Sequence, residues 1–345
     1  MILQFKVFLA AFALPLILFF SVSAFAQNDA ATASGQLSPP PAADANQPQT
    51  MTVDQYLDLL KSEVEKGNNE AMITLGIIYE RGQLGLDINY GTALDWFTKA
   101  AAAKVPEGLF NLGYFYQVGA GTAPDFKKAI DNYTEAAKLG LPMANLRLGN
   151  IYLDGKLGVA KSNEKAIQHL TQAGKDGIQD ADWQLATLYL NGPDGFPKDI
   201  AKGMQLLNSL ADKNYSQAIN ELGAIYYLGQ WNQKTDIPKA KGYFLRAADL
   251  LNNVAMKNLA AYYKNEGDNK KPNQTLALQW AILSFNFGQN TQEMAAFIQQ
   301  LRGEMKTEEI LAAENGAQDW ANKKVAEVRE QQQQQQNQVA PATGN

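Results

Sequence analysis

The fold of this chain is decided by the stretch Ala71-Met72-Ile73-Thr74-Leu75-Gly76-Ile77-Ile78-Tyr79-Glu80-Arg81-Gly82, because close copies of it return five more times. The copies carry Leu at Leu75, Leu112, Leu148, Leu185, Leu222 and Leu259, and a Tyr follows each Leu four residues later. Successive copies are 36 or 37 residues apart. A small residue lies four positions before each Leu and another lies directly after it. A constant period of this length predicts an array of repeats rather than one globular core.

The spacing of these positions predicts the first helix of each repeat. In each copy, Leu follows the first small residue by four positions, the second small residue follows Leu by one, and Tyr follows that residue by three. On a helix, these four positions form one stripe. The small residues let a neighbouring helix approach, and Leu and Tyr fill the remaining space. Three residues after the Tyr, five copies have Gly, which ends a helix with a positive φ at little steric cost. The sixth copy differs, with Glu266 in that position and Gly267 one residue later.

A column of residues that cap helix N-termini predicts the second helix of each repeat. The column contains Asn89, Asp125, Ser162, Asp199, Asp236 and Asn273, whose side-chain oxygens can accept hydrogen bonds from free backbone N–H groups. Another small residue follows four positions later, then a bulky pair such as Trp96-Phe97. A two-helix unit cannot bury its apolar face alone, so successive units must stack. The sequence therefore predicts an all-α fold, a right-handed α/α solenoid of about six helix-turn-helix repeats with capping helices.

The repeat resembles the Sel1-like repeat, which is related to the tetratricopeptide repeat. The fullest copies are residues 71–101 and 108–140, which contain Leu-Gly-x2-Tyr-x2-Gly, a Gly-bearing loop and a final Ala-Ala pair. Tetratricopeptide repeats are 34 residues long, so the longer period favours the Sel1-like repeat. The resemblance implies an adaptor or scaffold of a type often exported by bacteria, which assembles envelope complexes or meets host proteins. Some members bind β-lactams, but those are rich in Cys, and this chain has none.

The ends of the chain predict segments outside the repeats. Residues 1–26 contain Lys6, an apolar run and Ala24-Phe25-Ala26, which together are typical of a signal peptide cut after Ala26. The apolar run is long enough that a retained membrane anchor is the alternative. Residues 27–50 are rich in Pro, Ala and Gln and are expected to be a disordered linker. We expect an N-terminal capping helix in 51–69, the six repeats in 70–288, C-terminal capping helices in 289–330 and a disordered Gln-rich tail in 331–345.

Composition excludes several classes of function. The formal net charge is −5 and Lys and Arg are scattered, which argues against nucleic-acid binding. The chain has one His and no Cys, so a zinc cage or a nucleophilic Cys is not expected, and His169 falls in the bulky column of the second helices as a packing residue. Paired carboxylates such as Glu80 and Asp87 could act as acid and base, but solvated charges are the simpler interpretation. We expect no metal, no other cofactor and no catalytic residue.

The first helices are predicted to line the concave side of the solenoid and to bind a partner there. Positions two before and two after each Leu vary between repeats, while the flanking columns stay fixed. The variable positions mix rings with amides, a chemistry suited to an extended peptide or a glycan. The candidate partner-binding residues are Phe110, Tyr114, Gln117, Asn150, Trp183, Asn191, Asn220 and Tyr227. The alternative is that several of these rings pack between repeats.

These expectations favour a non-catalytic protein–protein interaction scaffold that is periplasmic or secreted. Its partner would be a protein, an extended peptide or an envelope glycan, and it would meet the membrane only through a transient signal peptide. The alternative is a carbohydrate-, peptidoglycan- or β-lactam-binding, hydrolase-like protein. A buried carboxylate with a strongly raised pKa in the groove would favour that alternative.

Overall fold

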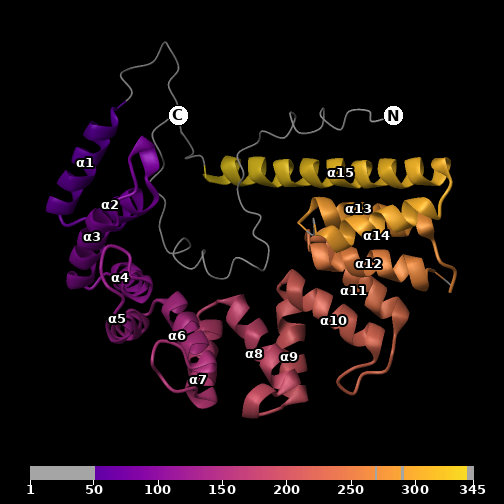
Figure 1. Cartoon of the computed structure of the whole chain (residues 1–345), viewed down its shortest axis with the longest axis horizontal. Coiled ribbons are helices and arrows are strands. Elements are labelled where there is room, and N and C mark those ends of the chain that lie inside the picture. The colour runs from indigo at the N-terminus through magenta and orange to yellow at the C-terminus, as the bar shows by residue number, and fades with distance from the viewer. Residues whose placement is uncertain (1–50, 269, 289–290, 340–345) are drawn as a thin grey trace. The chain divides into compact units, whose positions relative to one another are not determined.

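The computed structural model describes residues 51–268, 270–288 and 291–339, and these residues form α-helices joined by short turns (Figure 1). The predicted signal peptide, the linker up to residue 50 and residues 340–345 lie outside this part of the chain. The helices are α1 Val53–Glu65, α2 Asn69–Arg81, α3 Tyr90–Ala102, α4 Pro106–Val118, α5 Phe126–Lys138, α6 Pro142–Asp154, α7 Asn163–Lys175, α8 Gln179–Asn191, α9 Ile200–Asp212, α10 Ser216–Leu228, α11 Ile237–Asp249, α12 Asn253–Asn265, α13 Gln274–Asn286, α14 Gln292–Gly303 and α15 Thr307–Val339. Among the described residues, no helix combines the length and the apolar character needed to cross a bilayer.

The predicted caps of the second helices are confirmed in all six repeats. In each, the side-chain oxygen of the cap residue accepts from the backbone N–H three residues later, at 2.9 to 3.3 Å. The backbone N–H of each cap residue also donates to the carbonyl oxygen of the repeat's Tyr at 2.7 to 2.9 Å, for example from Asn89 to Tyr79. These two bonds fix where the loop leaves the first helix and where the second helix starts.

The small residues of the repeat permit close approach of the two helices in a pair. A Cβ atom built on Gly76 of α2 would lie 2.4 Å from Cε1 of Phe97 on α3, and one on Gly223 of α10 would lie 2.6 Å from Cδ1 of Phe244 on α11. Both rings are buried. The tight helix pair therefore depends on the absence of a side chain at the residue after the Leu.

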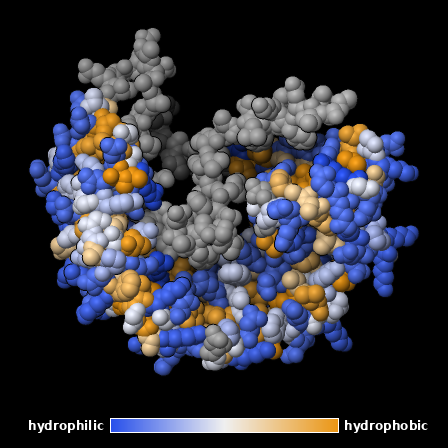
Figure 2. Space-filling model, viewed as in Figure 1, coloured by the Kyte–Doolittle hydropathy of each residue, from blue (hydrophilic) through white to orange (hydrophobic). Residues whose placement is uncertain are grey.

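The described chain divides into two compact units, residues 51–203 and residues 204–339. In the first unit, consecutive helices from α1 to α8 pack on one another, and their apolar residues form clusters that span neighbouring repeats. In the second unit, α10 to α13 pack in the same consecutive way, and both α14 and α15 pack on α13. The ring of Trp320 on α15 lies 5.8 Å from those of Trp280 and Phe287, so that the long last helix covers the aromatic end of repeat six. On the face shown in Figure 2, hydrophobic residues form small patches among hydrophilic ones.

The last helix continues further than the sequence suggested. We expected residues 331–345 to be disordered, but α15 runs through the Gln run to Val339. Gln has a good helix propensity, and a helix that is already nucleated and anchored by Trp320 extends at little cost.

Candidate functional site

The candidate site is the surface of the first helices that is not used for packing within a helix pair. An α-helix turns by about 100° per residue. The side of a first helix opposite its repeat Leu therefore contains the positions five and two residues before that Leu and the positions two, five and six residues after it. We call this set of positions the first-helix surface of each unit: it lies on α2, α4, α6 and α8 in residues 51–203 and on α10 and α12 in residues 204–339. The six repeat Leu residues themselves are at most 6% exposed. In contrast, the residues two positions after Leu are half-buried in the first five repeats and exposed in the sixth: Ile77, Tyr114, Asn150, Thr187, Ala224 and Ala261.

The positions two before each Leu are not all accessible, which corrects part of the prediction. Phe110 is only 2% exposed, and its ring lies 5.3 Å from the ring of Tyr133. It belongs to a cluster that includes Leu148 of the next repeat. Ile73 and Leu146 are buried as well. A large apolar side chain at this position fills the space beside the following repeat, so Phe110 is a core residue and not available to a partner.

Three predicted residues, Tyr114 and Gln117 on α4 and Asn150 on α6, are half-buried, and they differ in the contacts that their side chains already make. The Tyr114 ring is half-buried and packs edge-on to Phe115, with centroids 6.4 Å apart. The side-chain carbonyl of Gln117 accepts from the hydroxyl of Tyr133 at 3.0 Å, so one of its polar groups is already used. Asn150 is half-buried, one repeat beyond Tyr114 in the same column. Tyr114 and Asn150 therefore remain the candidates for partner contact.

The α8 candidates present one ring and one amide. Trp183 is half-buried, and its indole Nε1 is buried with no hydrogen-bond partner in the described part of the chain. A buried N–H without an acceptor costs free energy, and a conformational adjustment or a ligand acceptor would relieve that cost. Asn191 is exposed and donates from Nδ2 to the carbonyl of Thr187 on its own helix at 3.0 Å.

In the second unit, the structure joins residues that the sequence pattern did not connect. The Oδ1 atom of Asn220 on α10 accepts from Nδ2 of Asn258 on α12 at 2.9 Å. Asn258 was not predicted, since its partner is 38 residues away. Tyr227 is half-buried, and burial and the nearby Glu266 raise the pKa of its hydroxyl.

Two carboxylates on the first helices carry raised pKa values. Burial raises the pKa of Glu80 at the end of α2, and the charge of Arg81 offsets part of that effect. Burial alone raises the pKa of Glu221 on α10. Neither shift arises from a second carboxylate. Glu80 was predicted to be a solvated charge, whereas the structure half-buries it, and Glu221 was missed because nothing local to it signals burial.

His169 has the packing role that the sequence suggested. Its ring is stacked on Tyr152 with centroids 5.7 Å apart and an interplanar angle of 4°, and its Nδ1 atom lies 3.0 Å from Oδ1 of Asn145. Burial, followed by the charge of Lys165, lowers the pKa of the imidazole. The neutral ring with Nδ1–H as donor satisfies the buried Asn145 carbonyl.

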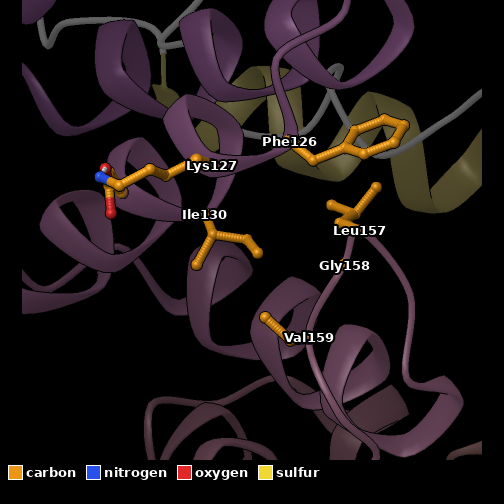
Figure 3. Close-up of a pocket in the computed structure, with 7 residues that line it drawn as sticks. Phe126, Lys127, Ile130, Leu157, Gly158 and Val159 are labelled. Carbon is orange, nitrogen blue, oxygen red and sulfur yellow. Dashed lines mark hydrogen bonds and ion pairs between the residues drawn. The ribbon is translucent and has the colours of Figure 1, made fainter.

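A shallow pocket of about 400 Å³ lies between α5 and the loop that precedes α7 (Figure 3). Its walls are the apolar side chains of Phe126, Ile130, Leu157 and Val159, together with Gly158. Its charged lining residues, Lys127 and Asp131, form an ion pair with each other at 2.7 Å. None of the predicted site residues lines it, and its chemistry suits an apolar side chain rather than a reaction. Among the described residues, no group of three or more His, Asp or Glu side chains is arranged to hold a metal ion.

Comparison with known proteins agrees with the repeat architecture. The Sel1 repeat family model matches residues 69–105, 106–141, 142–178, 179–215, 216–250 and 253–285. The chain is 36% identical over 110 residues to "ERAD-associated E3 ubiquitin-protein ligase component HRD3B" of Arabidopsis thaliana, a match that covers 31% of this chain and 17% of that protein. It is 32% identical over 89 residues to "Chitin synthase regulatory factor 3" of Schizosaccharomyces pombe, covering 26% of this chain and 10% of that protein. The chain thus matches less than a fifth of the length of these two curated relatives.

A solved structure matches a larger share of the chain. The Sel1 repeat protein from Oxalobacter formigenes has 31% sequence identity and a TM-score of 0.59, and the match covers 67% of this chain and 93% of that one. The helix-pair repeat seen in the structure is therefore shared along most of the length of that protein.

Proposed function

Because the chain belongs to the Sel1 repeat family, we propose that it is a non-catalytic scaffold that binds an extended peptide or protein segment on its first-helix surface. One observation carries this proposal. The residues two positions after each Leu are at least partly accessible and differ in chemistry among the first five repeats, whereas the Leu column between the paired helices is buried and constant. A fixed framework with a variable face is what a specialised binding surface requires.

The relatives support the same class of function. They are named as a component of a ubiquitin ligase and as a regulatory factor of a synthase, and both names describe a role exerted through another protein. The half-buried rings of Tyr114 and Trp183 would supply large contact area at low conformational cost, and Asn150 would supply hydrogen bonds to a peptide backbone.

Site-specific crosslinking tests this assignment. A photo-crosslinking amino acid is placed at Tyr114, Asn150 or Thr187 on the first helices, and at Glu164 or Gln168 on the exposed side of α7 as matched controls. The proposal expects a crosslinked partner protein from the first-helix positions and none from α7. Crosslinks from α7 alone would show that the other face binds.

We further propose that the scaffold acts in the periplasm or outside the cell, since the residues before the linker have the composition of a signal peptide. The mass of the protein isolated from the envelope fraction tests this step. A mature chain that begins at Gln27 supports export, whereas a full-length chain that stays with membranes indicates a retained anchor.

A further inference from the structure

We propose that the first-helix surface of residues 51–203 recognises a basic segment of its partner, and that the carboxylate of Glu80 receives a Lys or Arg side chain of that segment. This inference rests on the scaffold function proposed above and specifies the chemistry of the occupant.

The geometry of the repeats shows that Glu80 lacks the partner that its counterpart has. Glu80 and Gln117 occupy the same position, five residues after the repeat Leu. In the second repeat, Gln117 accepts a hydrogen bond from the hydroxyl of Tyr133 at 3.0 Å. In the first repeat, the residue in the Tyr133 position is Phe97, which has no hydroxyl.

The two rings occupy equivalent places. Phe97 packs against Gly76 on α2, just as Tyr133 packs against Gly113 on α4, and both rings are fully buried. In the second repeat, the hydroxyl at the end of the Tyr133 ring reaches Gln117, and the equivalent ring of Phe97 ends without a hydroxyl. The third repeat pairs Leu153 with Leu170 at these two positions, so that neither a donor nor an acceptor is present there. The first repeat therefore keeps an acceptor without its donor.

The burial of Glu80 makes this unmatched carboxylate informative. The residue is half-buried, and the described residues give its carboxylate no hydrogen bond or ion pair. Arg81 affects it only through its charge. Its oxygens are not among the buried unpaired atoms of the described residues, so water reaches them, and a cation from a partner would replace that water and offset the partial desolvation of the carboxylate.

The charge of the surrounding surface favours the same occupant. In the first four repeats, the positions of the first-helix surface contain five carboxylates and one cation, and one of the carboxylates, Asp154, is ion-paired with Lys156 of the following loop. These six residues are Glu70, Glu80, Glu107, Asp154, Asp180 and Arg81. Glu70 and Glu107 lie in equivalent positions one repeat apart. The half-buried Tyr114, on the adjacent first helix, adds an aromatic ring. An acidic surface with an aromatic ring attracts an ammonium or guanidinium group by charge and by its quadrupole.

Three variants test the proposal in the full chain. Glu80→Gln removes the charge and keeps the shape. Phe97→Tyr supplies, inside the protein, the hydroxyl that Tyr133 supplies to Gln117, and the equivalent site shows that a Tyr ring fits against a helix Gly. Glu164→Gln on α7 removes an exposed carboxylate from the opposite helix set and is the matched control. The probes are two fluorescently labelled peptides, one in which Lys alternates with Ala and one in which Gln replaces each Lys. Binding of each peptide is measured by fluorescence anisotropy.

The wild type is expected to bind the Lys peptide, and not the Gln peptide, with an affinity that falls as salt is added. Glu80→Gln is expected to raise the Kd about 10-fold, which is typical for loss of one charge-assisted hydrogen bond. Phe97→Tyr is also expected to raise the Kd, because its hydroxyl would donate to the Glu80 carboxylate and compete with the peptide. The same internal hydrogen bond is expected to raise the melting temperature. Glu164→Gln is expected to leave the Kd unchanged.

Equal binding of the Lys and Gln peptides, or an unchanged Kd in Glu80→Gln with a wild-type circular dichroism spectrum, would overturn the inference. The crosslinking experiment separates this outcome from failure of the scaffold itself. A partner crosslinked from Tyr114 with an unaffected Glu80→Gln variant would leave the scaffold standing and remove the role of Glu80.

Discussion

The close approach of α10 and α11 predicts that Gly223 cannot accept even a methyl group without cost. A Cβ atom at this position would lie 2.6 Å from both Cδ1 and Cε1 of Phe244, a ring that is 3% exposed. Carbon atoms in contact prefer about 3.5 to 4.0 Å, so either the ring or the helix must move. The matched control is Gly242 on α11, which is exposed and where an added Cβ would meet nothing within 4 Å.

The expected magnitudes follow from two opposing effects. Replacing an interior helical Gly by Ala stabilises the folded state by about 1 kcal/mol through helix propensity, and this gain applies equally to both positions. Overpacking a well-filled site costs about 1–3 kcal/mol. We therefore expect Gly242→Ala to raise the free energy of unfolding by about 1 kcal/mol and Gly223→Ala to lower it by about 1 kcal/mol.

The measurement is urea unfolding of the full chain followed by circular dichroism, combined with native-state hydrogen exchange. Exchange is needed because repeat arrays can open in parts, and the amides of α10 and α11 report the local free energy of opening. The double variant Gly223→Ala, Phe244→Leu should recover part of the loss, since repeat four carries Ala186 and Leu207 in these two columns.

A Gly223→Ala variant as stable as Gly242→Ala would refute the reasoning. It would mean that the ring of Phe244 shifts at no cost and that the Gly of the repeat does not set the distance between the helices. An additive double variant would also contradict the model, because residues in direct contact are expected to couple.

Three further predictions concern single residues. Asn89→Ala removes the cap of α3, whose Oδ1 accepts from the Thr92 N–H at 3.0 Å, and should lower stability by about 1 kcal/mol, while Asn89→Asp should not, as urea unfolding would show. Lys104→Gly, at a φ of 58°, should raise stability by about 0.5–1 kcal/mol, whereas Lys104→Ala, which keeps a Cβ, should not. The pKa of His169 is lowered in the fold, so the unfolded chain takes up the proton first, and stability should fall as the pH drops below about 6.5. A His169→Gln variant should show a flatter melting temperature between pH 7 and pH 5 in a thermal scan (about the range in which His titrates), and an unchanged slope would contradict the assignment.

Features encoded within a few residues could be predicted from the sequence. Each N-cap bond of the second helices joins residues three apart, such as Asp125 and Lys128, so the side chain and its target are fixed by local geometry. The Gly at the end of the first helices is fixed in the same way, since Gly82 and Gly229 have φ values of 61° and 67°. The irregular sixth repeat was also visible, because the positive φ occurs at Gly267, one residue later than in the other copies.

Features that depend on a neighbouring repeat could be predicted only in part. The position two before Leu was taken as surface, but whether it is covered depends on the size of the side chain and on the helix of the next repeat. Phe110 is large and apolar and is buried there, whereas Lys257 in the same column is exposed. The Asn220–Asn258 hydrogen bond and the contact of Trp320 with Trp280 join residues about 40 positions apart, and no local pattern marks them.

The sequence by itself determined the number of repeats, the Gly that ends most of the first helices and the caps of the second helices, because periodicity and backbone hydrogen bonding act within one repeat. Only the tertiary structure decided which first-helix residues stay accessible, which amides pair and that Glu80 lacks a donor. Those properties arise from distances between side chains of different helices, and the chain sets such distances only when neighbouring helices pack.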